Sequence, residues 1–272
     1  MVHLERAAAF VGRHGTDVER ARLASLLTGR APSETIVDAL FAGQRPDGGW
    51  SPFWASDYSS RDATCYRLAQ ADQLGLNSAE PVQRAVRFLL ARQASDGSWQ
   101  EDSSVRDAAP PWAQPGDPAA RLYLTANCGY WLAILESETE AAGRAARFLA
   151  GHLGDDGSLP TFPHSHWLAA GLWYRTGETA AAEAVLGHLT RCLSRLAASN
   201  LGWLVVTLQG VGLPAGHPLL RQATDRLAAE QQPDGRWVSE DGPERDVHAT
   251  LEALRAIRGG MTTSVPDIDP SI

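Results

Sequence analysis

Residues 93–99 read Gln93-Ala-Ser-Asp96-Gly97-Ser-Trp99, and this stretch decides the fold because the chain repeats it. The same pattern, Gln-x-x-Asp-Gly-x-Trp, occurs at residues 44–50 and 231–237. A decayed copy, Leu-Gly-Asp-Asp-Gly-Ser-Leu, occupies residues 153–159. Matches at four specified positions in three places do not arise readily by chance, so the sequence predicts a chain built from repeated units.

Each motif lies between two helical patterns. Before residues 93–99 the apolar residues recur at helical spacing, which predicts an amphipathic helix: Val82, Ala85, Val86, Leu89 and Leu90. Asp-Gly then favours a turn, because glycine accepts positive φ. The segments after the turns, such as 62–69 and 248–254, are small or apolar on most faces, which is typical of a buried helix. The unit is therefore an outer helix, a Gln/Trp turn and an inner helix.

Counting on this basis predicts an all-α chain. Two helices are expected near residues 3–13 and 17–29, and no strand-like alternation competes with the helical pattern. The outer and inner helices are expected in five pairs, at 33–43 with 58–75, 80–93 with 121–136, 139–152 with 163–176, 179–195 with 198–212, and 217–231 with 244–258. Residues 1–258 then form one domain, and the aperiodic residues 259–272 a loose tail.

Composition excludes several classes of protein. The chain has 272 residues, of which 44% are hydrophobic, so a large core is expected. A net charge of −8 argues against a nucleic-acid partner. No apolar run approaches the roughly 20 residues that span a bilayer, and the first residues lack the pattern of a signal peptide. Three scattered cysteines indicate reduced thiols, and we expect a cytoplasmic protein.

The Gln-x-x-Asp-Gly-x-Trp repeats resemble the QW motifs of squalene–hopene cyclases and of protein prenyltransferase β subunits, and the resemblance covers about residues 33–258. It implies an α/α-toroid, a ring of about five to six helix hairpins with inner and outer layers. It also implies that the Gln and Trp side chains tie successive hairpins together. The fold alone does not decide the chemistry, because such rings include proton-initiated cyclases, zinc-dependent prenyltransferases and proteins without a reaction.

In such a ring the inner helices are parallel, so residues in their first turns can meet at one mouth. Matching Asp62-Ala-Thr to His248-Ala-Thr puts Asp62 and His248 at equivalent positions, and aligning the third inner helix on its C-terminal glycine puts His164 there as well. A carboxylate and two imidazoles are the groups from which an acid–base site is built. The helix N-termini at the same mouth favour anions such as diphosphate.

Residues 60–65, Ser-Arg-Asp-Ala-Thr-Cys, resemble the acidic segment with which class II terpene cyclases protonate an alkene or epoxide. The resemblance makes Asp62 the general acid, tuned by His164 or His248. The segment departs from the family pattern at Ser60 and Ala63, where that pattern has aspartates. The alternative interpretation of Asp62 is a helix N-terminal carboxylate stabilised by the helix dipole.

Aromatic and basic side chains on or near the inner helices are candidates for substrate binding. Aromatic faces can stabilise a carbocation, although large rings also simply fill a wide barrel; the aromatic candidates are Tyr58, Tyr66, Trp131, Trp167 and Trp173. A diphosphate on the substrate is expected to meet Arg61, Arg106 or Arg245. Protonation itself needs no cofactor, but an acidic loop resembles a motif that some diterpene cyclases use for Mg²⁺ and diphosphate, with Glu240, Asp241 and Glu244 as candidate ligands. For this loop a solvated surface is the competing interpretation.

Three functions therefore stay open. The first is proton-initiated cyclisation of an isoprenoid or polyene in an apolar cavity. The second is a zinc-dependent prenyltransferase. The candidate zinc ligands are Asp62, Cys65, His164, His166 and His248. The third is a non-catalytic lipid-binding or interaction module, which the missing aspartates favour. A single ring implies a small cavity that a second copy of the chain could complete as a homodimer, and a peripheral membrane contact is compatible with an apolar substrate.

Overall fold

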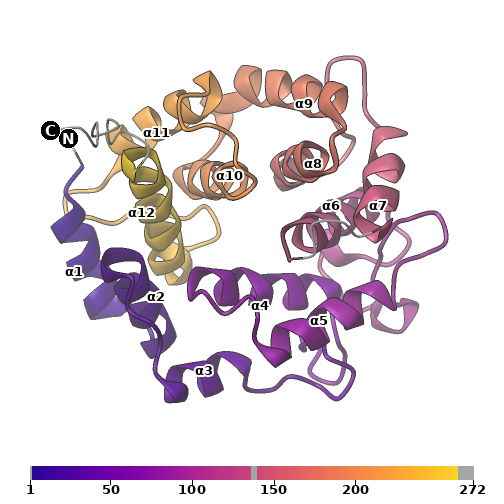
Figure 1. Ribbon diagram of the computed structural model, residues 1–272, viewed down its shortest axis with the longest axis horizontal. Helices are drawn as coiled ribbons and strands as arrows, with labels where there is room; N and C mark the ends of the chain where they lie inside the picture. The colour runs from indigo at the N-terminus through magenta and orange to yellow at the C-terminus, as the bar shows by residue number, and fades with distance from the viewer. Residues whose placement is uncertain (1, 136–139, 263–272) are drawn as a thin grey trace, which may run out of the picture. The chain divides into compact units, whose positions relative to one another are not determined.

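A computed structural model describes residues 2–135 and 140–262 of the chain, with side chains up to residue 259. The chain divides into two compact units, one comprising Met1–Leu23 and Cys192–Ile272 and the other Ala24–Arg191 (Figure 1). Throughout the described residues the regular structure is helical, and an isolated bridge between Trp50 and Ser60 is the only β pairing. The all-α prediction is confirmed.

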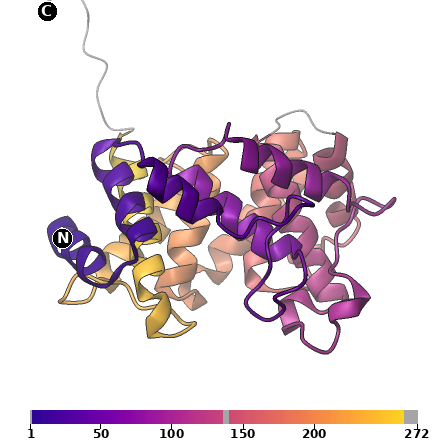
Figure 2. The ribbon, with the colours of Figure 1, turned by 90° about the horizontal axis from the view of Figure 1, so that it is seen from below.

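The second unit contains three of the expected helix pairs, α3 Glu34–Phe41 with α4 Arg61–Gln73, α5 Glu80–Leu90 with α6 Pro118–Leu135, and α7 Glu140–Ala150 with α8 Pro163–Thr176. Helix α6 packs against both α4 and α8, so the three inner helices lie side by side. Helices α5 and α7 are amphipathic, and each packs against the inner helix before it in sequence and the one after it. The loops that precede α4 and α6 extend from the same side of this unit (Figure 2).

The first unit contains α1 Leu4–His14, α10 Ala198–Gly210, α11 Pro218–Glu230 and α12 Asp246–Thr262. Helix α10 packs against α12, α11 packs against both, and α1 packs against α12. Helices α2 Asp17–Thr28 and α9 Thr179–Cys192 contain the junctions between the units. Helix α12 continues past Gly259, where the sequence predicts the end of the helix; the rest of the expected tail, 263–272, lies outside the described residues.

The glutamine of the repeated motif has the same structural role in each of the three turns. The side-chain amide of Gln93 donates to Gly97 O within its own turn (2.8 Å) and to Ala141 O at the start of α7 (2.8 Å). The same pair of bonds is made by Gln44, to Gly48 O and Pro81 O, and by Gln231, to Gly235 O and His3 O. Each glutamine thus joins its own turn to the beginning of another outer helix, as the resemblance implies.

The glycine of the motif is required where the turn meets the next helix. Gly97 has φ +92°, and a Cβ at this position would lie 2.6 Å from Arg144 O of α7. A side chain would therefore meet both an unfavourable backbone conformation and a backbone atom that cannot move without displacing the helix. The two tryptophans Trp99 and Trp237 fill the space behind the turns; each is buried, and each indole N–H donates to a carbonyl at the end of the preceding helix (Leu89 O, 2.8 Å; Leu227 O, 2.7 Å).

Within the described part of the chain, no helix combines the length and the apolar character that crossing a membrane requires.

Candidate active site

The repeat fixes the register of the inner helices through one hydrogen bond. The backbone N–H of each motif tryptophan donates to a threonine hydroxyl in the following inner helix, and that hydroxyl donates to the carbonyl four residues before it. The pairs are Trp50 with Thr64 (3.2 Å), Trp99 with Thr125 (3.0 Å) and Trp237 with Thr250 (3.1 Å). In the decayed repeat Leu159 N donates instead to Nε2 of His166 (3.0 Å), so this imidazole replaces the threonine.

The residue two places before this acceptor occupies the same position in every one of these helices. It is Asp62 in α4, Tyr123 in α6, His164 in α8 and His248 in α12. The hydrogen bonds therefore support the equivalence of Asp62, His164 and His248 that the sequence predicts. They also exclude His166 from this position: its Nδ1 donates to Pro163 O (3.1 Å) and its Nε2 accepts from Leu159, so it has the role of a structural residue.

Asp62 is partly exposed, and its carboxylate is held by three donors from two other segments. Oδ1 accepts from the hydroxyl of Tyr123 (2.8 Å) and, at longer range, from Nδ2 of Asn127 (3.4 Å). Oδ2 accepts from the indole Nε1 of Trp112 (3.1 Å). Tyr123 and Asn127 lie one turn apart on α6, and Trp112 lies in a short 3₁₀ helix, Pro111–Ala113, of the long loop before α6.

In this cluster the Asp62 carboxyl keeps its proton to a higher pH than the carboxyl of an aspartate surrounded by water. Removal from water, opposed by the hydrogen bonds of Tyr123, Trp112 and Asn127 and reinforced by the charge of Glu101, raises the pKa of Asp62 to about 6. Burial and the neighbouring Asp62 carboxylate raise the pKa of Tyr123 well above its ordinary value, so Tyr123 stays a neutral donor. Cys65, one turn further along α4, is likewise kept neutral, because burial raises the pKa of its thiol.

His164 reaches this cluster through Tyr123. The two rings lie with their centroids 6.2 Å apart and their planes at 62°, and the His164 ring also packs edge-on against Trp167 (5.4 Å). The structure thus links two of the three predicted catalytic residues, Asp62 on α4 and His164 on α8, through Tyr123 on α6, which lies between these two helices in one unit.

His248 lies in the first unit, where it has its own partners. Its Nδ1 lies 3.3 Å from Nη2 of Arg22, a buried arginine that also forms an ion pair with the buried carboxylate of Glu252 (3.4 Å). Burial, and then the charge of Arg22, lowers the pKa of His248 to about 4, so this imidazole is neutral near neutral pH.

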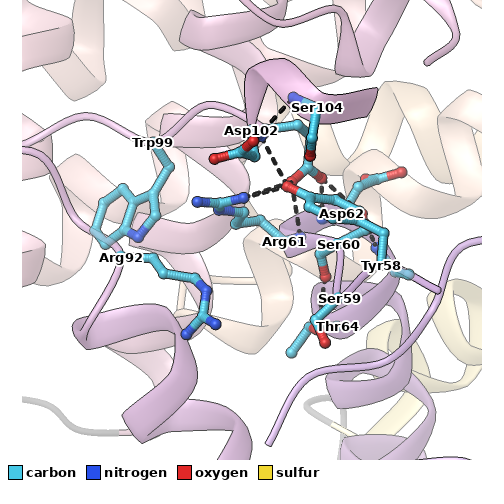
Figure 3. A network of polar contacts seen from close by, with 12 residues as sticks. Tyr58, Ser59, Ser60, Arg61, Asp62, Thr64, Arg92, Trp99, Asp102 and Ser104 are labelled. Carbon is cyan, nitrogen blue, oxygen red and sulfur yellow. Dashed lines mark hydrogen bonds and ion pairs between the residues drawn. The ribbon is translucent and has the colours of Figure 1, made fainter. Parts of the chain in front are cut away.

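The beginning of α4 is organised by a residue that the sequence did not single out, Glu101. This carboxylate is buried (1% exposed) and accepts from the Ser60 hydroxyl (2.6 Å), from the Tyr58 hydroxyl (3.0 Å) and from Nη1 of Arg61 (3.1 Å). It also accepts from two backbone N–H groups of α4, those of Arg61 (3.2 Å) and Asp62 (3.3 Å). Figure 3 shows Tyr58, Arg61 and Asp102 meeting at the beginning of the helix, while the Arg61 and Asp62 side chains leave it in different directions.

The predicted aromatic residues have different environments. Tyr58 is part of the Glu101 network, and burial raises the pKa of its hydroxyl. Trp167 and Trp173 are fully buried, and the indole of Trp173 donates to Ala146 O (3.0 Å), so this ring packs between α8 and α7. Trp131 is buried, whereas Tyr66 is 39% exposed. A role for these rings in lining a substrate cavity stays a prediction.

Two of the predicted diphosphate-binding arginines lie at one pocket. Arg61 and Arg106, together with Arg92, line a polar pocket of about 330 Å³ beside Glu101 and Asp102. Arg61 is committed to Glu101 there, and Arg92 forms an ion pair with Asp47 (2.7 Å). Arg245, the third candidate, is exposed in the other unit, in the 3₁₀ helix Pro243–Arg245.

The predicted magnesium ligands Glu240, Asp241 and Glu244 are all exposed, and Glu240 accepts a hydrogen bond from Asn200 (2.5 Å). Across residues 2–135 and 140–262 no group of three or more His, Cys, Asp or Glu side chains is arranged to hold a metal ion. Magnesium at this loop stays a prediction of the sequence.

The residues that complete the site were missed for identifiable reasons. Tyr123 could have been found by matching Thr125 to Thr64 and Thr250, because the same offset of two residues then selects it. Trp112 and Glu101 belong to the irregular loop before α6, where no periodicity indicates which side chains turn inward.

The comparisons with known proteins support the same fold. The sequence matches no family model. An ent-copalyl diphosphate synthase of Streptomyces sp. (strain KO-3988) is 29% identical over 133 residues, which are 48% of this chain and 23% of that protein. The type II terpene cyclase MstE from Scytonema, in its apo form, superimposes with a TM-score of 0.60 at 15% identity, covering 95% of this chain and 97% of that one. The chain has the fold of the type II terpene cyclases.

Two further structures agree with this fold. A variant of MstE in complex with merosterolic acid A, its product, gives a TM-score of 0.61 at 14% identity and covers 95% of this chain and 96% of that one. A protein from Actinoplanes gives a TM-score of 0.60 at 17% identity, covering 95% of this chain and 98% of that one. The type II terpene cyclase fold therefore accounts for almost the whole chain, whereas the similarity to the synthase concerns less than a quarter of that protein's length.

Proposed function

We propose that this chain catalyses a class II-type cyclisation, in which Asp62 protonates an alkene or epoxide of an isoprenoid or similar polyene. The observation that carries the proposal is the Asp62 carboxyl itself: it lies in the first turn of an inner helix, its pKa is raised to about 6, and three donors surround it. A carboxyl at the surface of a helix N-terminus would instead be ionised by water and by the helix dipole.

The hydrogen bonds indicate which oxygen carries the proton. Oδ1 accepts from both Tyr123 and Asn127, which occupies its two lone pairs, whereas Oδ2 accepts from Trp112 alone. The proton of the acid form is therefore expected on the remaining lone pair of Oδ2. When it leaves for the substrate, the new carboxylate already has its donors in place, and such prearranged stabilisation of a developing charge lowers the barrier.

His164 is proposed to tune Asp62, and His248 is considered within its own unit. The His164 ring packs on Tyr123, so it can fix the orientation of the hydroxyl that binds Asp62. His248 occupies the equivalent position in its own helix and is held neutral, so it can serve as an acceptor or donor of a hydrogen bond rather than as a cation. An apolar cavity lined by Trp131 and Tyr66 is part of the proposal, whereas the Trp167 ring is fully buried.

The names of similar proteins suggest which substrates to test. The structure of one MstE variant has geranylgeranyl dihydroxybenzoate bound as the substrate, and the Streptomyces protein is an ent-copalyl diphosphate synthase. We therefore propose a prenyl chain as the substrate. If it carries diphosphate, Arg106 or Arg245 is the proposed contact, because Arg61 is already paired with Glu101. Mg²⁺ at the acidic loop 240–244 stays a prediction. Protonation by Asp62 needs no cofactor. A peripheral membrane contact and a homodimer also stay predictions.

The test compares the wild-type protein with Asp62→Asn on farnesyl diphosphate, geranylgeranyl diphosphate, geranylgeranyl dihydroxybenzoate and squalene, with cyclic products identified by gas or liquid chromatography and mass spectrometry. Asp57→Asn is the matched control, because Asp57 is an exposed aspartate of the loop before α4. We expect a cyclic product from the wild type and from Asp57→Asn, and none from Asp62→Asn. Equal turnover by wild type and Asp62→Asn would remove the acid assignment.

A further inference from the structure

Beside the start of α4 lies a buried carboxylate, that of Glu101 in the loop before α6, which accepts five hydrogen bonds. Oε1 of Glu101 accepts from the Ser60 hydroxyl and from the backbone N–H of Asp62, and Oε2 accepts from Arg61, through its backbone and its guanidinium, and from Tyr58. A buried carboxylate is costly unless its lone pairs are satisfied in this way. So complete a network points to a specific task.

That task follows from the hydrogen-bonding needs of a helix N-terminus. The first N–H groups of a helix have no partners within it, and together with the helix dipole they attract a carboxylate in the first turn. Here Glu101 accepts from the N–H groups of Arg61 and Asp62, and the Ser60 side chain accepts from that of Ala63 (3.1 Å). The amides that would attract the Asp62 carboxylate are therefore already bound.

We propose that Glu101 is a positioning residue for Asp62: it takes over the amide groups at the start of α4 and supplies, from the loop, the carboxylate that the segment lacks at Ser60, so that Asp62 stays turned toward Tyr123 and Trp112. The Ser60 hydroxyl lies 2.6 Å from the Glu101 carboxylate, which places the missing negative charge beside residue 60 in space, although it is distant in sequence. This inference rests on the proposed role of Asp62 as the acid.

The charge of Glu101 has a second consequence. It raises the pKa of Asp62, because two neighbouring carboxylates resist being ionised together. The other titratable groups next to Asp62 are Tyr123 and Cys65, and both are held neutral by their raised pKa values. On the far side of the helix start, the Arg61 guanidinium is paired with Glu101 (3.1 Å).

The test is the titration of Asp62 in Glu101→Gln, read by infrared spectroscopy. The C=O band of the protonated Asp62 is isolated as the difference between each protein and its Asp62→Asn counterpart, between about pH 3 and about pH 8. Glutamine removes the negative charge and leaves the guanidinium of Arg61 unmatched, so we expect the pKa of Asp62 to fall by ~1 unit or more. The matched control is Asp102→Asn, which removes the same charge from the next residue. Asp102 is exposed, and its side chain accepts from Ser104 N (2.8 Å). The control is expected to leave the pKa of Asp62 unchanged.

An unchanged titration in Glu101→Gln, or an equal shift in Asp102→Asn, overturns the positioning role. Glu101→Asp provides a second test if the glutamine variant fails to fold: it keeps the charge but is one methylene shorter and cannot reach both amide groups. A smaller shift in the same direction is expected, and no shift contradicts the proposal. Because the infrared titration needs no turnover, it separates the two claims. Cyclisation by Asp62→Asn refutes the proposed function, whereas an unchanged titration refutes only the role of Glu101.

Discussion

Replacing Tyr123 by phenylalanine tests how the carboxyl of Asp62 is made into an acid. The change deletes one hydroxyl that donates to Oδ1 at 2.8 Å and leaves the ring that packs against His164. A hydrogen bond to a charged group contributes about 1.5–3 kcal/mol. If the bond reaches full strength only when Asp62 has given up its proton, the rate falls by roughly 10- to 150-fold. Because this bond lowers the pKa of Asp62, its loss also shifts the pH–rate profile to higher pH.

The measurement is kcat at several pH values on the substrate that the wild type cyclises. The loss is read on the low-pH plateau, where Asp62 is protonated in both proteins and the change in pKa does not disguise it. Tyr130→Phe is the matched control, since Tyr130 is a buried tyrosine on the same helix. An undiminished rate on the plateau, or an equal loss in both variants, would refute the idea that Tyr123 stabilises the conjugate base.

Three further predictions follow from the same structure. The wild-type rate should be lost as pH rises through about 6, because the reactive form of Asp62 is protonated and its pKa is about 6; a rate that increases with pH contradicts this. His248 has a pKa of about 4 in the folded chain against an ordinary 6.5. Its contribution to the free energy of unfolding is therefore complete above pH 6.5, and up to about 3 kcal/mol of it is lost as the pH drops toward 4. Chemical denaturation of His248→Gln should show this pH dependence flattened, and an unaltered one argues against it. Gly97→Ala places a Cβ 2.6 Å from Arg144 O and should destabilise the chain by more than about 2 kcal/mol. Gly75→Ala, at φ +70° in open space, should cost only about 1 kcal/mol. Equal unfolding midpoints for the two variants would contradict the steric argument.

The fold was accessible from the sequence because its signals are local. The turns at Gln44, Gln93 and Gln231 use side chains that bind their own backbone, so a seven-residue pattern is enough to locate them. The helices between them follow from apolar periodicity. The end of α12 was placed too early because two successive glycines at 259 and 260 are typical of a helix end, and here the helix continues through them to Thr262.

The site was only partly accessible. Asp62 and His164 were placed at equivalent positions from the sequence by matching Asp62-Ala-Thr to His248-Ala-Thr and by the C-terminal glycine of the third inner helix, whereas Tyr123 was missed although it has the same register. Trp112 and Glu101 are different: both lie in an irregular loop, and their contacts to Asp62 and Ser60 join residues about 40 to 50 positions apart. No spacing rule predicts which side chain of such a loop turns toward a helix start. The sequence alone therefore could not indicate that the Glu101 carboxylate lies beside Ser60, where the family pattern has an aspartate.

The most direct measurement of the central claim is the incorporation of solvent deuterium. The Asp62 carboxyl exchanges its proton with water between turnovers, so a cyclisation run in D₂O transfers one deuteron from the acid to the product. Mass spectrometry of the cyclic product formed from geranylgeranyl diphosphate or geranylgeranyl dihydroxybenzoate should show one deuterium per molecule, with any diphosphate retained. A cyclic product without solvent deuterium, or cyclisation that begins with release of diphosphate, would contradict the assignment of Asp62 as the initiating acid.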